Sequence, residues 1–296
     1  MMIKTFPRFS KISLGHRAEV YSMTLKHEPY SDFNFTALYS FDTEGIGGLS
    51  ILNRNLVIKI ADYQTSEPII SMMGQHFVAK SLKTIIGQGY KIKLIPEEVI
   101  KLSGDFGKSH FIQDRDNFDY IYSLKNLSQL EGGLYKKKRN KINRFIKDYG
   151  NEVEVSLVDK INPGFVHKID RMYHEWNLER DKHTEDLGSE KKALFRMLEN
   201  STHFNLRLFQ TTLGGKLVAF SLNEKLPGGY VICHFQKCLV SYRDMDAYLT
   251  NCVSRQLLAE GCNYINWEQD LGIKGLRESK EIFKPIKKLK KFTYKE

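Results

Sequence analysis

The chain has 296 residues, of which 41% are apolar and 27% charged, so it has the composition of an ordinary soluble globule and room for one large or two medium domains. Lys and Arg number 45 against 35 Asp and Glu, and the resulting net charge of +10 favours polyanionic partners such as nucleic acid, an anionic lipid surface or a phosphorylated small molecule. No apolar run has the length of a membrane span and the first ten residues lack the apolar core of a signal peptide, so we expect a cytoplasmic protein.

The first half of the chain predicts a short series of strands around one helix. Residues 48–52 and 55–60 alternate as a hairpin does, and residues 67–74 follow as a third strand. Apolar residues then recur at helical spacing over 78–86 before a glycine, and residues 90–96 predict a further strand.

The second half predicts a longer order of elements. Asn162 followed by Pro163 is a typical helix start, and Ser189 is expected to cap a second helix. Glycine-rich turns then separate three strands, and an apolar stripe ending at Gly261 indicates another helix before a short strand. The strands are expected at 204–212, 216–226, 230–240 and 263–267.

The order helix, helix, three strands, helix, strand is that of the GNAT-type acyltransferase fold. The first half repeats part of this order, so we expect two domains, 1–125 and 126–296. The predicted fold class is α+β, with tandem GNAT-like domains that each hold a mixed, mostly antiparallel sheet flanked by helices. Order alone does not give a function.

Two stretches carry a resemblance to a known family. They are FDYIYSLKNLSQLEGGLYKKKRNKINRF and YINWEQDLGIKGLRESKEIFKPIKKL, and they resemble the signatures of the DUF2156 family, also called the phosphatidylglycerol lysyltransferase C-terminal-like family. The resemblance covers nearly the whole chain. This sequence departs from the family pattern at Trp267 and Gln269, where Arg and Glu are expected, and at Gln236, where Glu is expected.

The resemblance implies an activity. The best-characterised relatives transfer lysine or alanine from aminoacyl-tRNA to the headgroup of phosphatidylglycerol. We therefore expect acyl or aminoacyl transfer to an amine or hydroxyl, on a lipid headgroup or a small molecule, with aminoacyl-tRNA as partner. The matching positions Asn266 and Lys237 are expected to bind substrate.

A donor is held, in GNAT-like enzymes, where the third strand of the meander gives way to the following helix. The corresponding stretch, SYRDMDAYL, lacks glycine, and Asp244 and Asp246 would place two carboxylates against a pyrophosphate. We expect neither acetyl-CoA nor another cofactor. Alternatively, the two aspartates only cap the helix.

The stretch NWEQDLGIKGLRESK is the predicted catalytic segment. Acyl transfer needs a base for the nucleophile and a cation or N–H donors for the oxyanion. Glu268 is the first candidate for base or substrate-amine clamp and Asp270 the second, while Arg277 and Lys280 are expected to hold the donor or the oxyanion. The alternative is a buried ionic network that attaches the C-terminal tail.

Four consecutive cations open the predicted helix after Gly132 and Gly133, although a helix N-terminus favours anions. On a helical wheel Arg139 points toward the protein, whereas most of the other cations form a basic face. With the second basic run KPIKKLKKFTYK, this face predicts a wall that binds tRNA or anionic lipid. The alternative is a solvated face. The expected anion-binding residues are Lys136, Lys137, Lys138, Lys141 and Arg144, with Arg139 binding substrate.

The cysteines and histidines indicate no metal site. The four cysteines form no CxxC pair, and HEW at His174 lacks a second histidine at helical spacing. The leading hypothesis is an aminoacyltransferase. A non-catalytic module that binds tRNA or another anionic ligand is the alternative, and peripheral association with an anionic membrane is a third.

Overall fold

The structure is a computed structural model that describes residues 2–180 and 187–295. It divides into two compact units. Unit 1 contains Met1–Tyr120, Glu268–Ile282 and Lys287–Glu296, and unit 2 contains Ile121–Trp267 and Phe283–Ile286. Most of the chain after Trp267 thus belongs with the N-terminal residues. The predicted domain 126–296 includes that segment, and its boundary stays a prediction.

Unit 1 is built from short helices and strands. They are α1 (Arg17–Thr24), α2 (Phe35–Phe41), β1 (Gly48–Leu52), β2 (Asn55–Ala61), β3 (Pro68–Met73), α3 (Val78–Ile86), β4 (Ile95–Pro96), α4 (Glu97–Leu102), α5 (Asp105–His110), β5 (Phe111–Gln113), α11 (Lys274–Ile282), β12 (Lys287–Leu289) and β13 (Lys291–Tyr294). β1, β2 and β3 form one antiparallel sheet, and β13 lies between β4 and β5 in another.

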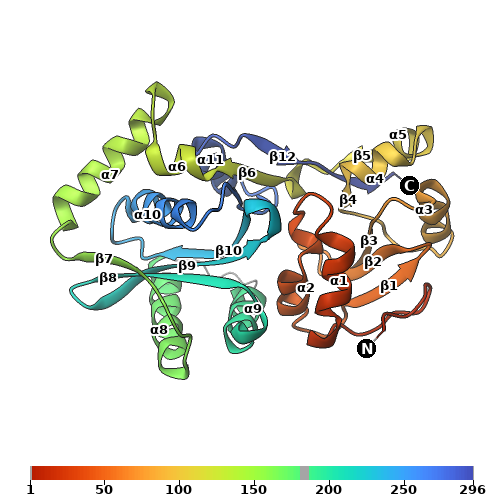
Figure 1. Ribbon diagram of the computed structural model, residues 1–296, viewed down its shortest axis with the longest axis horizontal. Coiled ribbons are helices and arrows are strands. Elements are labelled where there is room, and N and C mark those ends of the chain that lie inside the picture. The colour runs from red at the N-terminus through yellow and green to blue at the C-terminus, as the bar shows by residue number, and fades with distance from the viewer. Residues whose placement is uncertain (1, 181–186, 296) are drawn as a thin grey trace. The chain divides into compact units, whose positions relative to one another are not determined.

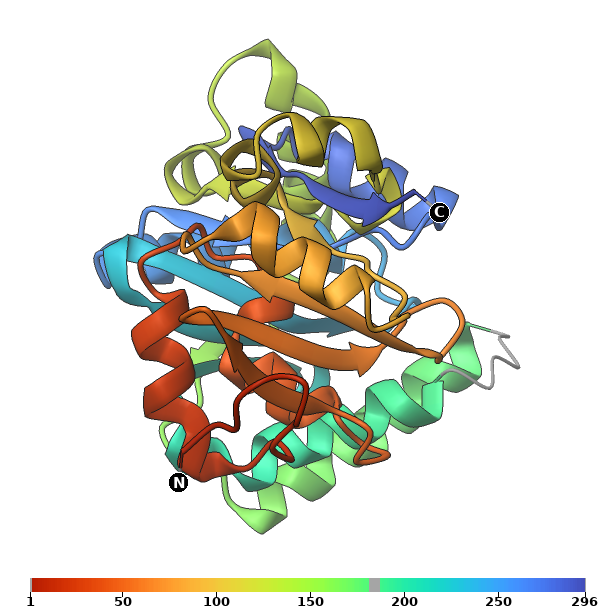
Figure 2. The same cartoon turned by 90° about the vertical axis from the view of Figure 1, so that its right-hand side faces the viewer.

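Apolar alternation explains the first of these sheets. Val57 of β2 and Ile70 of β3 belong to a core that also contains Leu82 of α3. Figure 2 shows α3 running along one face of the three orange strands. Leu56 and Ile58, which alternate with Val57, are also fully buried, so both faces of the sheet are covered.

Unit 2 contains the predicted GNAT-like order. Its elements are β6 (Asp119–Ser123, of which the first two residues belong to unit 1), α6 (Leu124–Gln129), α7 (Lys136–Tyr149), β7 (Val153–Leu157), α8 (Pro163–Glu179), α9 (Leu187–Glu199), β8 (Leu206–Leu213), β9 (Lys216–Leu226), β10 (Tyr230–Cys238), α10 (Met245–Ala259) and β11 (Tyr264–Asn266). The strands lie side by side in the order β6, β11, β10, β9, β8, β7. α10 covers one face of this sheet with α6 and α7 packed against it, and α8 and α9 cover the other (Figure 1).

The α+β prediction is confirmed, and the order of elements in the second half is the expected one. Two local predictions are wrong. α9 already contains Leu187, so Ser189 lies inside the helix and does not cap it. The expected strand at 90–96 is reduced to a single bridge at Ile92 and the two residues of β4, because Leu94 has a left-handed backbone with a φ of 62° that interrupts the extended run.

A buried ion cluster holds the C-terminal strand in unit 1. The side chain of Lys291 is fully buried, and its Nζ lies 2.7 Å from Asp119 and also contacts Asp32. Tyr63 donates a 2.8 Å hydrogen bond to Asp32, and Ser31 donates to Asp119 from its backbone N–H and its hydroxyl, at 2.7 and 2.8 Å. Burial disfavours the ammonium, but the two carboxylates outweigh it and raise the pKa of Lys291. Each charge of the cluster is therefore stable in the interior only while the opposite charges are present.

Replacing Lys291 with Met tests this cluster. The variant leaves two buried carboxylates without their cation, so we expect the free energy of unfolding in urea at pH 7 to fall by about 3–5 kcal/mol. Lys290→Met is the matched control, because its side chain is 42% exposed and pairs with Glu97. It should cost no more than about 1 kcal/mol. Equal losses in the two variants would contradict the proposed importance of the cluster.

Candidate active site

The parallel pair β10 and β11 opens after a short contact. The two strands pair only from Tyr230 and Tyr264 to Ile232 and Asn266, and the register of β10 shifts immediately afterwards, between Cys233 and Phe235. The rest of β10 continues without β11 beside it and pairs with β9 alone. A bulge bends its strand and ends regular pairing. In the described part of the chain, the C-terminal half of β10 therefore has β9 as its only partner strand, just before the junction with α10.

The junction between β10 and α10 is occupied by ion pairs. Asp244 has the N-cap position with a φ of 66°, but its side chain makes no capping hydrogen bond. Arg144 of α7 donates through Nε to its carboxylate at 2.6 Å, and Lys141 lies 3.5 Å from it. Asp244 therefore has the cap position through its backbone, while its side chain does not cap the helix and its charge is used to hold α7.

Lys138 does not lie on the exposed basic face. Its side chain is buried, 4% exposed, and its ammonium lies 3.2 Å from the centre of the Phe283 ring. Burial lowers the pKa of Lys138 to about 8, against the opposing effect of Asp246 and Asp244. The prediction that Lys138 belongs to the exposed wall was wrong because the helix turns this residue inward beside Ile142.

The other cations of α7 differ in their surroundings. Arg139 turns inward as predicted and donates to the carbonyl oxygens of Leu130 and Gly132, which stabilises the turn before the helix. Lys136 and Lys137 are exposed. Since Lys141 and Arg144 already contact Asp244, the basic face is weaker than its charge count indicates.

Lys237 lies on the other face of the sheet. Its Nζ lies 2.7 Å from Glu190 of α9 and 4.1 Å from the ring centre of Trp176 on α8, and Tyr173 also donates to Glu190. Burial lowers the pKa of Lys237 despite the neighbouring carboxylate. The preceding residue, Gln236, points the opposite way and donates a 3.0 Å hydrogen bond to Thr250 of α10. The hydrogen bond to Thr250 is thus made by the amide at position 236, where the family pattern has a glutamate.

In unit 1, Asp270 is the centre of an ionic network. Its fully buried carboxylate accepts hydrogen bonds from Tyr120 at 2.5 Å, Arg115 at 3.0 Å, Arg277 at 2.7 Å and the backbone of Gly272 at 2.9 Å. These donors outweigh burial and lower the pKa of Asp270 to about 2. A carboxylate so stabilised is a poor proton acceptor near neutral pH. The arrangement is the ionic network of the alternative interpretation, with Asp270 in place of Glu268.

Glu268, Lys280 and Asn266 are held by their surroundings. Glu268 has a φ of 54°, which is costly for a residue with a side chain, and its carbonyl accepts the N–H of Tyr120 at 3.2 Å. Lys280 is buried and donates to the carbonyl of Gln269 at 2.5 Å. Asn266, in unit 2, is fully buried at the end of β11. The catalytic and substrate-binding roles of these residues stay predictions.

Packing accounts for both departures from the family pattern in the last signature. Trp267 lies 4.3 Å from the ring of Tyr122 and 4.9 Å from that of Phe283, between ring centres. Gln269 donates through Nε2 to Asp32 and accepts from the hydroxyl of Ser31, both at 3.2 Å. A glutamate at position 269 would add a third buried carboxylate beside Asp32, so the amide suits this site better.

The C-terminal basic run is largely neutralised within unit 1. Its lysines pair with carboxylates, so the expectation that this run extends an electropositive wall was wrong. The pairs are Lys287 with Glu28, Lys288 with Glu281, Lys290 with Glu97, and Lys291 with Asp32 and Asp119. The sequence did not show these partners because they lie far away along the chain.

Sequence reasoning also missed Arg115 and Asp116. Arg115 contacts both Asp270 and Glu281, and Asp116 lies 2.6 Å from Arg277. The available signal was the alternation of charges in DRDN, directly before the first family signature.

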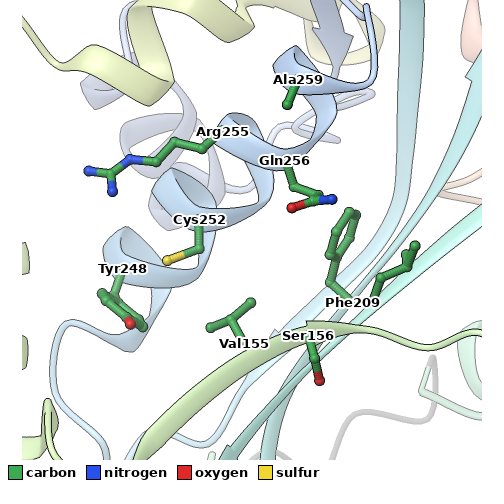
Figure 3. Close-up of a pocket in the computed structure, with 9 residues that line it drawn as sticks. Val155, Ser156, Phe209, Tyr248, Cys252, Arg255, Gln256 and Ala259 are labelled. Carbon is green, nitrogen blue, oxygen red and sulfur yellow. The ribbon is translucent and has the colours of Figure 1, made fainter.

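A cavity of about 510 Å³ lies in unit 2 between α10 and the strands β7 and β8 (Figure 3). Val155 and Phe209 line it from the strands and Arg255 and Gln256 from α10, with the Gln256 side chain directed toward Phe209. Burial raises the pKa of Cys252, so this lining thiol is a poor nucleophile. The lining contains neither a carboxylate nor a histidine, so this cavity has room for a ligand but offers no ordinary base.

The described residues contain no group of three or more His, Cys, Asp or Glu side chains that could hold a metal ion. Within the same part of the chain, every helix is too short or too polar to cross a bilayer.

The order of elements and the sheet of unit 2 define an α+β protein of the GNAT-like class. Residues 86–295 match the family described as Phosphatidylglycerol lysyltransferase, C-terminal, and the chain belongs to this family. The family predicted from the two signatures is therefore confirmed. The family name places the chain among transferases, and it does not state which reaction this chain performs.

Individual similarities are distant. A crystal structure of a conserved protein of unknown function from Bacteroides thetaiotaomicron is 24% identical, with a TM-score of 0.83 and 99% coverage of both chains. L-PGS from Bacillus licheniformis is 14% identical, with a TM-score of 0.62, and the match covers 100% of this chain and 94% of that one. An uncharacterized protein of Mycoplasmoides gallisepticum is 23% identical over 60% of this chain, and the match spans only 56% of that protein. The two structural matches show that the fold is shared.

Replacing Asp270 with Asn tests the ionic network. A carboxyl with a lowered pKa stabilises the fold above its unfolded pKa, near 3.8, and this contribution disappears as the pH falls toward about 2. We therefore expect Asp270→Asn to be clearly less stable than the wild type from pH 4 to pH 7 and nearly equal to it near pH 2. Urea unfolding across this pH range measures the difference. A pH-independent difference would contradict the network.

Proposed function

We propose that the protein transfers an aminoacyl group directly from aminoacyl-tRNA to an amine or hydroxyl acceptor on a lipid headgroup or small molecule. One observation carries the proposal: the junction between β10 and α10, where GNAT-like enzymes hold their donor, lies in the same unit as the cationic start of α7. Membership of a family named for phosphatidylglycerol lysyltransferase supports the same reaction class.

The junction before α10 supports a donor other than acetyl-CoA. A pyrophosphate needs free backbone N–H groups on a glycine-rich turn. Here the turn has no glycine, and Asp244 places a carboxylate there that already binds Arg144 and Lys141. An aminoacyl ester needs no such pyrophosphate site, because its anionic groups belong to the tRNA backbone.

The roles of individual residues are proposed from their chemistry, for each unit by itself. In unit 1, Glu268 is the candidate base or clamp for the substrate amine, while the ion pairs of Asp270 favour a structural role for that residue. Arg277 and Lys280 of the same unit are candidates for holding the donor or the oxyanion. In unit 2, Asn266, Lys237 and Arg139 are separate substrate-binding candidates. The exposed Lys136 and Lys137 would contact the phosphates of tRNA, and Lys141 and Arg144 would extend this surface.

A non-catalytic module that binds tRNA or another anionic ligand is the second candidate. The observation that favours it is the ionic network, which removes Asp270 from the set of bases and holds Arg277 between two carboxylates. The two candidates differ in whether the donor ester is cleaved.

Cleavage of a labelled aminoacyl-tRNA pool tests the transfer reaction. With a cell extract as the source of acceptors, the wild type should remove the label faster than spontaneous hydrolysis and place it in a new product. Glu268→Gln should slow this transfer at least about tenfold if Glu268 is base or clamp. The exposed Glu278→Gln on the same segment is the matched control and should keep the wild-type rate. Labelled acetyl-CoA should give no product.

Loss of label at the spontaneous rate with every protein would contradict the transferase and favour the binding module. Product formation from acetyl-CoA would instead contradict the proposed donor. Transfer by the wild type with no effect of Glu268→Gln would remove Glu268 from the reaction.

The salt dependence of tRNA binding tests the basic face. Each phosphate contact contributes a slope of roughly −0.7 to −0.9 to the dependence of log affinity on log salt. We expect affinity to fall clearly between about 50 and 200 mM salt, and the double variant Lys136→Ala, Lys137→Ala to reduce the slope by up to about 2. Lys125→Ala, on the exposed side of α6, should leave it unchanged. Salt-independent tRNA binding, or salt-sensitive sedimentation only with anionic liposomes, would overturn the tRNA proposal.

A further inference from the structure

Lys138 is a buried amine without a hydrogen-bond or ion-pair partner among the described residues. It occupies the first turn of α7, where the helix dipole disfavours a cation, and its side chain is 4% exposed. Its ammonium contacts the Phe283 ring, and it makes no hydrogen bond or ion pair with the residues that the structure describes. Burying an unpaired ammonium is costly, so a residue in this position is a candidate for function.

The surroundings of Lys138 come from three segments of unit 2. The start of α10 contributes Asp246 and its N-cap residue Asp244, which favour the ammonium, and α7 contributes Lys141, which disfavours it. The segment 283–286 contributes the ring of Phe283, which in turn packs edge-on against Trp267. Desolvation dominates, and the pKa of about 8 leaves roughly a quarter of the amine neutral at pH 7.5.

The neighbours of Lys138 include residues that follow β10 and β11. Asp246 is in the first turn of α10, directly after the β10 junction, and Trp267 directly follows the last residue of β11. The amine is therefore linked to the end of β11 through Phe283 and Trp267, and to the start of α10 through the charge of Asp246. This is where the reacting ester must lie if the donor occupies the GNAT-like position.

We propose that Lys138 is the proton acceptor of the transfer reaction, in place of Glu268. Its neutral Nζ takes a proton from the acceptor amine or hydroxyl as that group attacks the ester carbonyl. The new C–N or C–O bond forms, the ester C–O bond breaks, and its electron pair goes to the ribose oxygen of the tRNA. The proton then passes from Nζ to that oxygen. This inference rests on the proposed function.

Two other roles for Lys138 predict different results. A cation that stabilises the oxyanion must stay protonated, so the rate would fall as the pH rises through 8, and Arg would replace Lys138 well. A purely structural cation–π contact would also be kept by Arg. A base requires the neutral form, so the rate must rise toward a plateau above about pH 8, and Arg must fail because it stays protonated.

Single-turnover transfer from aminoacyl-tRNA between pH 6 and 9.5 tests the base. Phosphatidylglycerol vesicles supply a hydroxyl acceptor and ethanolamine an amine, in separate reactions, with spontaneous hydrolysis subtracted. We expect Lys138→Met and Lys138→Arg each to lose at least about 100-fold in rate and to lose the rise with pH. Lys125→Met, an exposed lysine of unit 2 on α6, should keep the wild-type rate and profile.

A second experiment measures the pKa of Lys138 without using the transfer reaction. In protein labelled with ¹³C at lysine Cε, the resonance that is missing from Lys138→Met should titrate near pH 8, well below that of the exposed Lys125. A value above about 10 would overturn the inference.

The outcomes separate the inference from the function on which it rests. Wild-type transfer that Lys138→Arg retains, or a rate that falls above pH 8, overturns the role of Lys138 and leaves the transferase intact. No transfer by the wild type with either acceptor, or with a cell extract, overturns the transferase and the role of Lys138 together. Loss of transfer in both variants with unchanged thermal unfolding supports the base.

Discussion

The stability of unit 1 depends on the buried ion pairs that Lys291 makes with two carboxylates. Its strand ends the chain, yet the amine lies between the carboxylates of Asp32 and Asp119, which come from distant segments. Neither carboxylate is stable in the protein interior without a cation, and the cation is not stable without them. These ion pairs therefore fix the position of the C-terminal strand in unit 1. The segment around Glu268 and Asp270, which precedes this strand in the sequence, belongs to the same unit.

The same rule of charge burial distinguishes the residues that hold the structure from those that have a chemical role. Asp270 has four donors around its carboxylate, so its charge is fully compensated and its proton affinity is low. Lys138 has an aromatic ring and no hydrogen-bonding partner among the described residues, so its proton affinity is that of a weak base near neutral pH. A compensated charge stabilises the fold, whereas an uncompensated one is kept at a cost to stability and is a candidate for function.

Fewer cations are available to bind a polyanion in the folded protein than the basic composition indicates. Most lysines near the C-terminus pair with carboxylates of unit 1, and Arg144 and Lys141 pair with Asp244. The exposed cations of α7 that remain are few, which suits a surface that contacts part of a polyanion. To position a large tRNA, a transferase needs a local cluster of cations that contacts one segment of the phosphate backbone. A positive charge spread over the whole surface is less important for this.

The sequence by itself determined the family, the α+β class and the order of elements in the second half, because apolar periodicity, glycine turns and contiguous signatures are local features. It also predicted that Arg139 turns inward, since helical spacing decides that. The partners of Asp270, Lys138 and Lys291 were decided only by the tertiary structure. Ion pairs join residues far apart along the chain, and desolvation depends on what covers a side chain, so neither can be read from spacing.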